Sequence, residues 1–333
     1  MKTRQLGSTG PTVSRLGLGA MGMSDLYGPA DEAESIATIH AALDAGITLI
    51  DTGDFYGSGH NEMLIRDALR SGNRDDVLIS VKFGSLRDPA GGWQAAPSDT
   101  APAAVKDRLA YTLRRLGTDH VDIYRPSRLN PNIPVEDTVG AIAEMVQAGY
   151  VRHIGLSEVG AQSLRRAAAV HPISDLQIEY SLVSRAIEAE ILPTARELGI
   201  GVTAYGVLSR GLLSGHWGAE RHLSAGDFRG MSPRFQGDNL GRNLALVEAL
   251  RAVAERLGAS VAQVAIAWVA AQGEDIVPLV GARRRDRLVE SLAAADVVLS
   301  AGDLAAIEAA VPEGSAAGSR YADAMLASMD SER

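Results

Sequence analysis

The segment Thr48–Gly57 reads TLIDTGDFYG, and about one helix further along the chain Ile79–Lys82 reads ISVK. Each segment is a short apolar run that stops at a charged residue, a pattern typical of a buried parallel strand where it reaches the polar end of a barrel. We therefore expect Asp51 and Lys82 to end two strands. Tyr56 follows Asp51 in a short glycine-containing loop, so a phenol, an ammonium and a carboxylate are expected to converge on one site.

These three side chains suit the reduction of a carbonyl group. Hydride addition places negative charge on the carbonyl oxygen, and a nearby proton donor must neutralise that charge as it develops. A phenol gives up its proton slowly near neutral pH, whereas a neighbouring ammonium favours the phenolate and lowers the phenol pKa. We expect Lys82 to act in this way on Tyr56, with Asp51 holding Lys82 charged and in place.

A simpler interpretation stays open on these residues alone, because Asp51–Asp54 also fits an ordinary turn and a lysine at a strand end is commonly solvated. The longer segment Ile50–Glu62, which reads IDTGDFYGSGHNE, resembles the signature of the aldo-keto reductase family. In that family an aspartate and a tyrosine occupy these places, and a lysine closes the next strand. The resemblance extends from Leu6 to about Ala294 and implies an NADPH-dependent carbonyl reductase.

Length and composition bound the fold and the partners. The 333 residues, 46% of them hydrophobic, can form one α/β barrel or two average domains, and we expect a single domain over residues 1–333. A net charge of −9 without a long basic run argues against nucleic acid or an anionic membrane and favours a small-molecule carbonyl substrate. The absence of cysteine excludes disulfides and thiolate metal sites. Without a recognisable signal peptide or membrane span, we expect a cytoplasmic protein of unknown oligomeric state.

Strand patterns alternate with helix patterns along the chain. Eight strands are predicted, at residues 16–19, 47–51, 77–82, 121–124, 151–157, 176–179, 202–205 and 276–279. Helices are predicted at residues 34–45, 61–69, 103–116, 135–147, 163–169, 189–198, 244–257, 261–271 and 285–294. A β-hairpin over residues 4–13 precedes them. This order favours an α/β fold, a (β/α)8 TIM barrel with an N-terminal β-hairpin and an extra helix before the last strand, over a doubly wound sheet.

The end of the first predicted strand carries closely spaced glycines. Residues 17–22 match the pattern GxGxxG, but a lone match is weak evidence for a Rossmann dinucleotide-binding turn, and no acidic residue follows in a cofactor-like context. The family resemblance instead implies that backbone at Gly19, Ala20 and Met21 approaches the edge of the nicotinamide ring. We therefore place these three residues among the expected cofactor contacts.

Strand ends further along the chain carry the remaining nicotinamide contacts that the resemblance implies. In the family a Ser-Asn pair and a glutamine hold the nicotinamide carboxamide, and an aromatic residue stacks on the ring. Ser157, Gln177 and Tyr205 match these places, although each would otherwise pass for an ordinary strand-end or core residue. Glu158 departs from the asparagine and exchanges an amide for a charge, so it is not counted among the expected contacts.

The segment over residues 206–243 is too long to be a simple connection, and we interpret it as a lid over the cofactor. The start of this segment contains glycines, a hydroxyl and a cation, and its backbone amides suit the binding of a pyrophosphate. The residues expected to contact the cofactor there are Leu208, Ser209, Arg210 and Gly211. A disordered insertion is the alternative, which Trp217 and two phenylalanines make less favourable.

After the last predicted strand, several arginines stand at the start of a helix. A helix N-terminus favours anions and guanidinium groups bind phosphate with two hydrogen bonds, so this is where a 2′-phosphate would be held. The family has arginines at 283 and 287 and a Glu-Asn pair that touches the adenine. We therefore expect Gly281, Arg283, Arg287, Glu290 and Ser291 to contact NADPH, with Ser291 departing from the family asparagine. A solvated basic helix is the alternative.

The main departure from the family lies at Ser127, where the family has a catalytic histidine. Serine offers a short hydrogen bond to the substrate carbonyl but no charge, and no other histidine is placed to substitute. Members similar to pyridoxal reductases also lack this histidine, and Arg125 is a second candidate for its role. We expect Asp51, Tyr56, Lys82 and Ser127 to be the catalytic residues. The alternative function is an NADPH-binding redox-sensing or regulatory subunit with little turnover.

Overall fold

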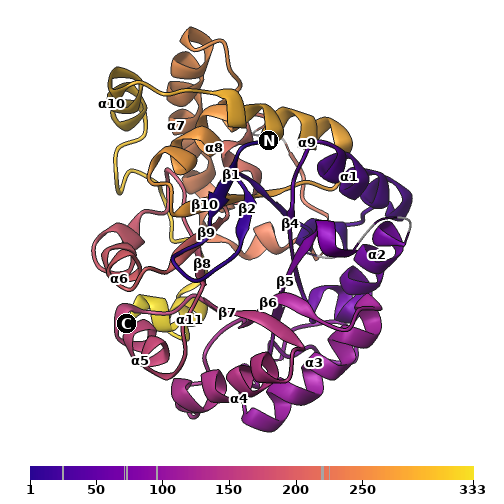
Figure 1. Cartoon of the computed structure of the whole chain (residues 1–333). Helices are drawn as coiled ribbons and strands as arrows, with labels where there is room; N and C mark the ends of the chain where they lie inside the picture. The colour runs from indigo at the N-terminus through magenta and orange to yellow at the C-terminus, as the bar shows by residue number, and fades with distance from the viewer. Residues whose placement is uncertain (25, 71, 73, 95–96, 219–220, 225) are drawn as a thin grey trace.

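In the computed structural model, eight parallel strands close into a barrel that helices surround (Figure 1). The structure describes residues 1–24, 26–70, 72, 74–94, 97–218, 221–224 and 226–333. The barrel strands are β3 (Gly17–Gly19), β4 (Leu49–Gly53), β5 (Leu78–Phe83), β6 (Val121–Pro126), β7 (Val151–Ser157), β8 (Asp175–Glu179), β9 (Gly201–Tyr205) and β10 (Ile276–Gly281). Each strand pairs with the next in the chain, and β10 pairs with β3, which confirms the predicted (β/α)8 TIM barrel.

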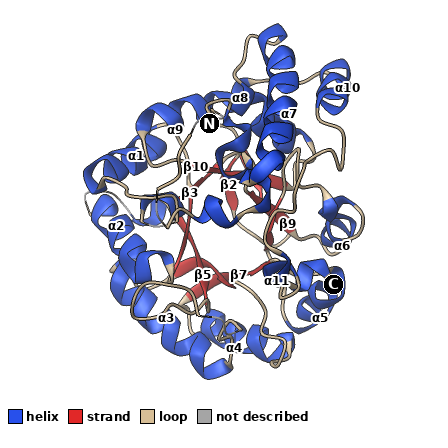
Figure 2. Ribbon diagram, turned by 180° about the vertical axis from the view of Figure 1, so that it is seen from behind, coloured by secondary structure: helices blue, strands red, loops and turns tan. Residues whose placement is uncertain are grey.

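Helices follow the strands and form the outer layer (Figure 2). They are α1 (Glu32–Asp44), α2 (His60–Leu69), α3 (Pro102–Leu116), α4 (Val135–Gln147), α5 (Ala161–Val170), α6 (Ile191–Glu197), α7 (Gly237–Arg256), α8 (Val261–Ala271), α9 (Arg285–Leu292), α10 (Ala301–Ala310) and α11 (Asp323–Leu326). Both α7 and α8 stand between β9 and β10, so the extra helix before the last strand is confirmed. A capping box at Ser260 fixes the start of α8, since its hydroxyl accepts from Gln263 N.

The predicted N-terminal hairpin closes one end of the barrel. Strands β1 (Thr3–Gln5) and β2 (Thr12–Ser14) pair antiparallel. Val13 of β2 and Leu6, which follows β1, are fully buried against barrel residues of β4, β6 and β10. A Cβ on Gly201 would lie 2.5 Å from Gly7 N, so only glycine lets the hairpin approach β9 this closely. The site must therefore lie at the opposite end, where the strands have their carboxyl termini.

Some predicted boundaries differ from the structure. Helix α7 begins at Gly237 rather than at residue 244, because its first turns, GDNLGRN, lack an apolar repeat. Helices α10 and α11 were not predicted, since α10 is alanine-rich with only Ile307 buried and α11 is a single turn. The second and fourth barrel strands run two residues further than predicted, to Gly53 and Pro126.

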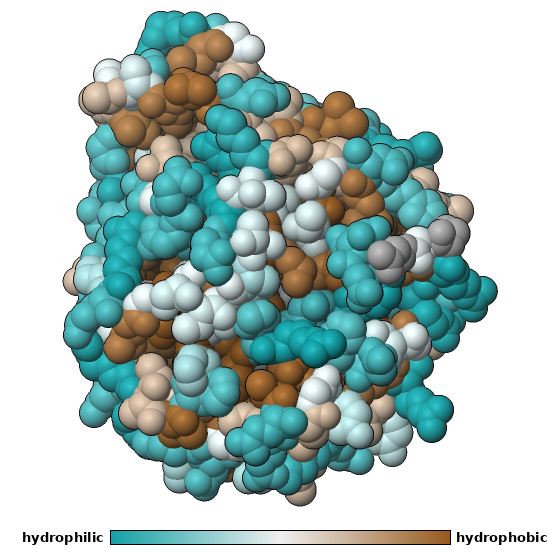
Figure 3. All heavy atoms as spheres, in the orientation of Figure 1, coloured by the Kyte–Doolittle hydropathy of each residue, from teal (hydrophilic) through white to brown (hydrophobic). Residues whose placement is uncertain are grey.

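Packed side chains fill the barrel rather than leaving a channel. Leu49, Ile123, Val277 and Leu279 from three of its strands form one buried cluster with Leu6 and Val13. The space-filling view from the side of Figure 1 shows hydrophilic residues along much of the outline of the molecule (Figure 3). Within the described ranges, no single helix is long and apolar enough to span a membrane; α7 and α8 pass that test only as a pair bent by 85°.

Candidate active site

The barrel brings Asp51 and Lys82 together because β4 and β5 are neighbours. In their register Gly53 pairs with Lys82, so the lysine side chain reaches back to Asp51 and forms a buried ion pair with Asp51 Oδ1. The other carboxylate oxygen, Oδ2, accepts hydrogen bonds from Ser80 Oγ at 2.9 Å and from Gln177 Nε2 at 2.7 Å. Asp51 is thus the fixed acceptor at the centre of this group.

Tyr56 lies in a tight turn directly after β4. Left-handed backbone at Gly57 and Gly59, with φ of 55° and 96°, shapes this turn, and glycine adopts such angles without strain. The Tyr56 ring is buried, packs edge-on against Phe55 with centroids 4.9 Å apart, and lies 5.2 Å from Lys82 Nζ. The phenol, ammonium and carboxylate predicted from the sequence therefore do converge.

The pKa values in this group follow from burial. Burial raises the pKa of the Tyr56 phenol well above 10.0, and the Asp51 charge adds to the rise, while Arg128 lowers it. Burial likewise lowers the pKa of the Lys82 ammonium to about 8, although Asp51 acts in the opposite direction. The net shift on Tyr56 is opposite to the lowered pKa expected from the sequence, because loss of hydration and the Asp51 charge outweigh the effect of Arg128.

Ser127 lies just past the end of β6. Its amide donates to Phe83 O at 2.8 Å, and its hydroxyl shares a 2.7 Å hydrogen bond with Ser85 Oγ from the loop after β5. Arg128 is next in the chain; it donates to Ser127 O at 2.6 Å and is partly buried. Burial alone would lower the pKa of Arg128, but the Tyr205 phenol and the Glu158 carboxylate raise it, so the group is cationic.

Arg125 is not at the mouth of the site. Its guanidinium is fully buried inside the barrel, 3.0 Å from Asp175 Oδ2, and donates to Thr203 Oγ1 at 3.1 Å. Gly155 makes room for this pair, since a Cβ there would collide with Asp175 Oδ1. The suggestion that Arg125 replaces the family histidine is therefore wrong on geometry, and the cation beside Ser127 is Arg128.

The expected carboxamide contacts lie at the ends of β7 and β8. Among the described residues, Ser157 Oγ is buried and has no hydrogen-bond partner. A buried hydroxyl without a partner fits a site that a bound polar group completes. Gln177 faces Asp51, which links this rim of the barrel to the Asp51–Lys82 pair. Ser157 and Gln177 therefore fit the carboxamide of a nicotinamide cofactor.

The backbone expected to flank the nicotinamide lies beside Asp51. Gly19 ends β3, and the amide of Ala20 donates to Asp51 O at 3.0 Å. Ala20 O in turn accepts from Asn61 Nδ2 at 2.9 Å, and Met21 begins a short 3-10 turn. These residues are held at the same rim as Asp51 and Ser157.

Tyr205 and Glu158 reveal contacts that sequence reasoning missed. The Tyr205 hydroxyl donates to Glu158 Oε1 at 2.7 Å and lies 2.9 Å from the Tyr321 hydroxyl. Arg320 also binds Glu158, so the departure from asparagine recruits a guanidinium from the C-terminal segment. In the sequence, only the charge of Glu158 at a buried strand end indicates that it needs a cationic partner. That partner, Arg320, lies 162 residues away in the chain.

The start of the predicted lid is a 3-10 segment, Ser209–Ser214, which Leu208 precedes. Ser209, Arg210 and Gly211 have positive φ angles of 44°, 57° and 94°. Arg210 pairs with the buried Glu179 at 2.9 Å, and its guanidinium lies 4.4 Å from the centroid of the Tyr321 ring. Its cation is therefore engaged by Glu179 within the barrel mouth, and a pyrophosphate contact from this segment stays a prediction.

The second half of the lid meets the loop after β3. Phe228 N donates to Leu26 O at 2.8 Å, and the Arg229 guanidinium lies 5.0 Å from the centroid of the Tyr27 ring. Arg229 is itself held by Asp227. Residues 219, 220 and 225 of the predicted lid lie outside the described residues. The two loops together bridge one side of the barrel mouth.

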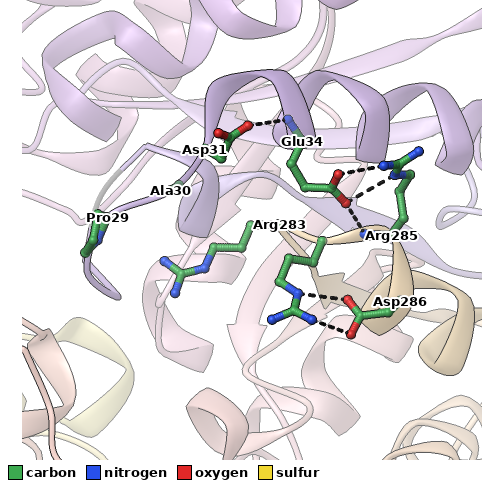
Figure 4. Close-up of a pocket in the computed structure, with 8 residues that line it drawn as sticks. Pro29, Ala30, Asp31, Glu34, Arg283, Arg285 and Asp286 are labelled. Atoms are coloured by element: carbon green, nitrogen blue, oxygen red, sulfur yellow. Dashed lines mark hydrogen bonds and ion pairs between the residues drawn. The ribbon is translucent and has the colours of Figure 1, made fainter.

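A cavity of about 730 Å³ lies between the starts of α1 and α9 (Figure 4). Two arginines on its wall are paired at 2.8 Å with acidic side chains, Arg284 with Asp286 and Arg285 with Glu34. Arg283 instead donates to the backbone carbonyls of Tyr27 and Gly28 at 3.1 and 3.0 Å, and its side chain points away from those acids in Figure 4. Burial and the neighbouring Arg229 lower the pKa of Arg283, as expected where cations crowd together.

The expected adenine contacts lie further along α9. Glu290 pairs with His216 of the lid at 2.8 Å and with Arg287 at 3.2 Å. Ser291, the residue after Glu290, is buried, and Gly281, the last residue of β10, is exposed. The lid and α9 are thus tied together where the sequence predicts the adenosine end of the cofactor.

The chain is similar to proteins of one family over nearly its whole length. Residues 15–312 match the family model described as the aldo/keto reductase family. The chain is 39% identical over 318 residues to a probable aldo-keto reductase 1 of Glycine max, covering 95% of this chain and 91% of that protein. A glycerol dehydrogenase of Gluconobacter oxydans superposes with a TM-score of 0.83 at 29% identity, covering 92% and 94% of the two chains. The holo form of an aldo-keto reductase of Bacillus halodurans gives 0.74 at 28% identity, covering 93% and 96%. The chain therefore belongs to the aldo/keto reductase family, oxidoreductases that interconvert carbonyl and alcohol groups with NAD(P)H.

Proposed function

We propose that the protein uses NADPH to reduce an aldehyde or an activated ketone to an alcohol, with Tyr56 as the proton donor. The observation that carries this proposal is the convergence of Tyr56, Lys82 and Asp51 at one buried site beside Ser157. When bound, the reduced nicotinamide supplies the hydride for the carbonyl carbon. The protein's own residues supply the proton and the charge that the carbonyl oxygen requires.

Tyr56 holds the proton at its hydroxyl until the substrate oxygen becomes negative. Its raised pKa keeps the phenol protonated at neutral pH, which is the form that a reduction needs. Lys82 is charged below about pH 8 and stabilises negative charge passing to the phenol oxygen. Asp51 fixes the position of Lys82 and also holds Gln177, so the proton donor and the carboxamide site share one anchor.

The oxygen of the substrate is oriented by the end of β6. Ser127 offers one hydroxyl, already paired with Ser85, and Arg128 adds a positive charge next to it. A neutral hydroxyl polarises a carbonyl less than an imidazole does, so the preferred substrates are those already activated, such as aromatic aldehydes, dicarbonyls or pyridoxal.

The preference for NADPH over NADH rests on the arginines at the start of α9. Arg283 contacts only backbone carbonyls in its described hydrogen bonds, and Arg287 is half exposed beside Glu290. A 2′-phosphate carries the charge that such guanidinium groups bind with two hydrogen bonds. Gly281 and Ser291 flank the same place.

A regulatory subunit with little turnover is not favoured, because the relative in Glycine max and the structural neighbours carry the names of reductases and a dehydrogenase. The proposed function is tested by following NADPH oxidation by the purified wild type with aromatic aldehydes, dicarbonyls, pyridoxal and simple ketones. Turnover of an activated carbonyl, faster than that of the simple ketone, supports the proposal. Tight NADPH binding without turnover on any of them would contradict it.

A further inference from the structure

The C-terminal segment 317–333 is fastened to the carboxyl ends of β7, β8 and β9. Helix α11 and the C-terminus lie beside α5 in both views of the ribbon (Figures 1 and 2). Asp330 accepts from Gly160 N at 2.8 Å, and Ser331 N donates to Glu158 O at 3.2 Å. The segment is therefore held by specific hydrogen bonds at the rim where the nicotinamide contacts are expected.

The strongest of these contacts is the pair between Glu158 and Arg320. Arg320 donates from two nitrogens to the two oxygens of Glu158, at 2.9 and 2.5 Å. Glu158 also accepts from the Tyr205 hydroxyl and from Ser331 Oγ, each at 2.7 Å, and its side chain is fully buried. Burial alone would raise the pKa of Glu158, but the charges of Arg320 and Arg128 outweigh it and lower the pKa to about 2. Glu158 is thus a buried carboxylate that stays ionised.

This carboxylate lies next to two expected nicotinamide contacts. Ser157 precedes it in the chain and has an unpaired buried hydroxyl, and Tyr205 is hydrogen-bonded to its Oε1. A second buried carboxylate, Glu179, lies close by and pairs with Arg210 at 2.9 Å, while Arg320 is 3.6 Å away. Arg234 lies 3.5 Å from Glu179 as well, and Arg128 acts on Glu158. The charge of this rim therefore depends on the balance between these guanidinium groups and the two carboxylates.

We propose that Arg320 is a positioning residue that neutralises Glu158 beside the nicotinamide pocket and so sets the relative affinity for NADP+ and NADPH. This inference rests on the proposed function, since it requires that the pocket bind a nicotinamide. The nicotinamide ring is cationic when oxidised and neutral when reduced. An unpaired buried carboxylate attracts the first and has no comparable effect on the second. The Glu158–Arg320 pair keeps the pocket from holding the oxidised product too tightly.

The test measures dissociation constants of NADP+ and NADPH separately, by calorimetry, for the wild type and four variants. Arg320→Met removes the guanidinium that holds both oxygens of Glu158 and leaves Arg128 to offset that charge. It is expected to raise the ratio Kd(NADPH)/Kd(NADP+) by about tenfold. Glu158→Gln keeps a hydrogen-bonding group beside Tyr205 but removes one negative charge from the rim, so the ratio falls. The double variant Arg320→Met/Glu158→Gln is expected to return to within about twofold of the wild type.

Glu332→Gln is the matched control, because Glu332 also binds Arg320, at 2.6 Å, but is partly exposed and makes no described contact to Tyr205 or Ser157. Its ratio is expected to stay unchanged. If Arg320→Met does not fold, Glu158→Gln decides alone, since its expected shift has the opposite sign. Equal ratios in all variants, with both nucleotides still bound, would overturn this inference and leave the proposed function standing. A wild type that binds neither nucleotide would overturn the proposed function and the inference with it.

Discussion

Replacing Arg125 by methionine is expected to destabilise the barrel rather than to impair the chemistry directly. The Arg125 and Asp175 side chains are both fully buried, with the charged atoms 3.0 Å apart, and the second nearby carboxylate, Asp51, lies 3.9 Å from Arg125. Arg125→Met leaves Asp175 without its cation inside the barrel. Breaking a buried ion pair from one side typically costs about 3 to 5 kcal/mol of unfolding free energy.

The loss is expected to depend on pH in a defined direction. Burial already raises the pKa of Asp175, and the charge of Arg125 opposes that rise. Without Arg125 the folded-state pKa climbs further above the unfolded value, so the folded protein binds more protons than the unfolded one. Stability then falls as pH rises between the folded-state pKa of Asp175 in the wild type and the higher one in the variant, so the destabilisation by Arg125→Met grows with pH over that interval.

Urea unfolding, followed by circular dichroism over a series of pH values, measures this effect. Asp175→Leu combined with Arg125→Met removes both charges and is expected to recover most of the lost stability, because neither charge is then left unpaired. The reasoning is refuted if Arg125→Met unfolds within about 1 kcal/mol of the wild type, or if a folded Arg125→Met protein binds NADPH normally yet has lost turnover.

Three further predictions concern the site itself. Burial lowers the pKa of Lys82 to about 8, so kcat/KM for reduction at saturating NADPH should be flat at lower pH and fall about tenfold per pH unit above 8. A profile that stays flat to pH 10 would show that the lysine charge is not needed. Replacing both Arg283 and Arg287 by alanine should weaken NADPH binding, measured by fluorescence titration, at least about tenfold more than NADH binding. Equal losses of affinity for the two nucleotides would exclude a 2′-phosphate site at these arginines. Ser127→His should raise turnover of a simple ketone by roughly tenfold, and Arg128→Met should lower turnover of an aldehyde. Turnover unchanged by either substitution would mean that the end of β6 does not orient the substrate.

Much of the barrel is readable from the sequence, because each buried strand is an apolar run and Asp51 and Lys82 stand where two runs stop. The sequence therefore predicts all eight strands, but it does not predict α10, because its alanines form no apolar stripe. The convergence of Tyr56 with Lys82 was also predictable, since parallel neighbouring strands end on one rim.

Other features depend on contacts between residues that lie far apart in the sequence, and no local sequence pattern predicts such contacts. Arg125 and Ser127 are two residues apart, yet only the closed barrel shows that Arg125 faces Asp175 inside while Ser127 lies at the rim. The partner of Glu158 comes from the C-terminal segment, which carries no recognisable motif. The pKa of Tyr56 likewise depends on burial, which raises it where the sequence led us to expect a pKa lowered by Lys82.

The most direct test of the central claim is the single substitution Tyr56→Phe. It removes the hydroxyl that donates the proton and keeps the ring that packs against Phe55. With an activated aldehyde, kcat is expected to fall by roughly 10²- to 10⁴-fold, while the dissociation constant of NADPH and the urea midpoint stay close to those of the wild type. A Tyr56→Phe protein that binds NADPH and still reduces the aldehyde at a near-wild-type rate would contradict the assignment of Tyr56 as the proton donor.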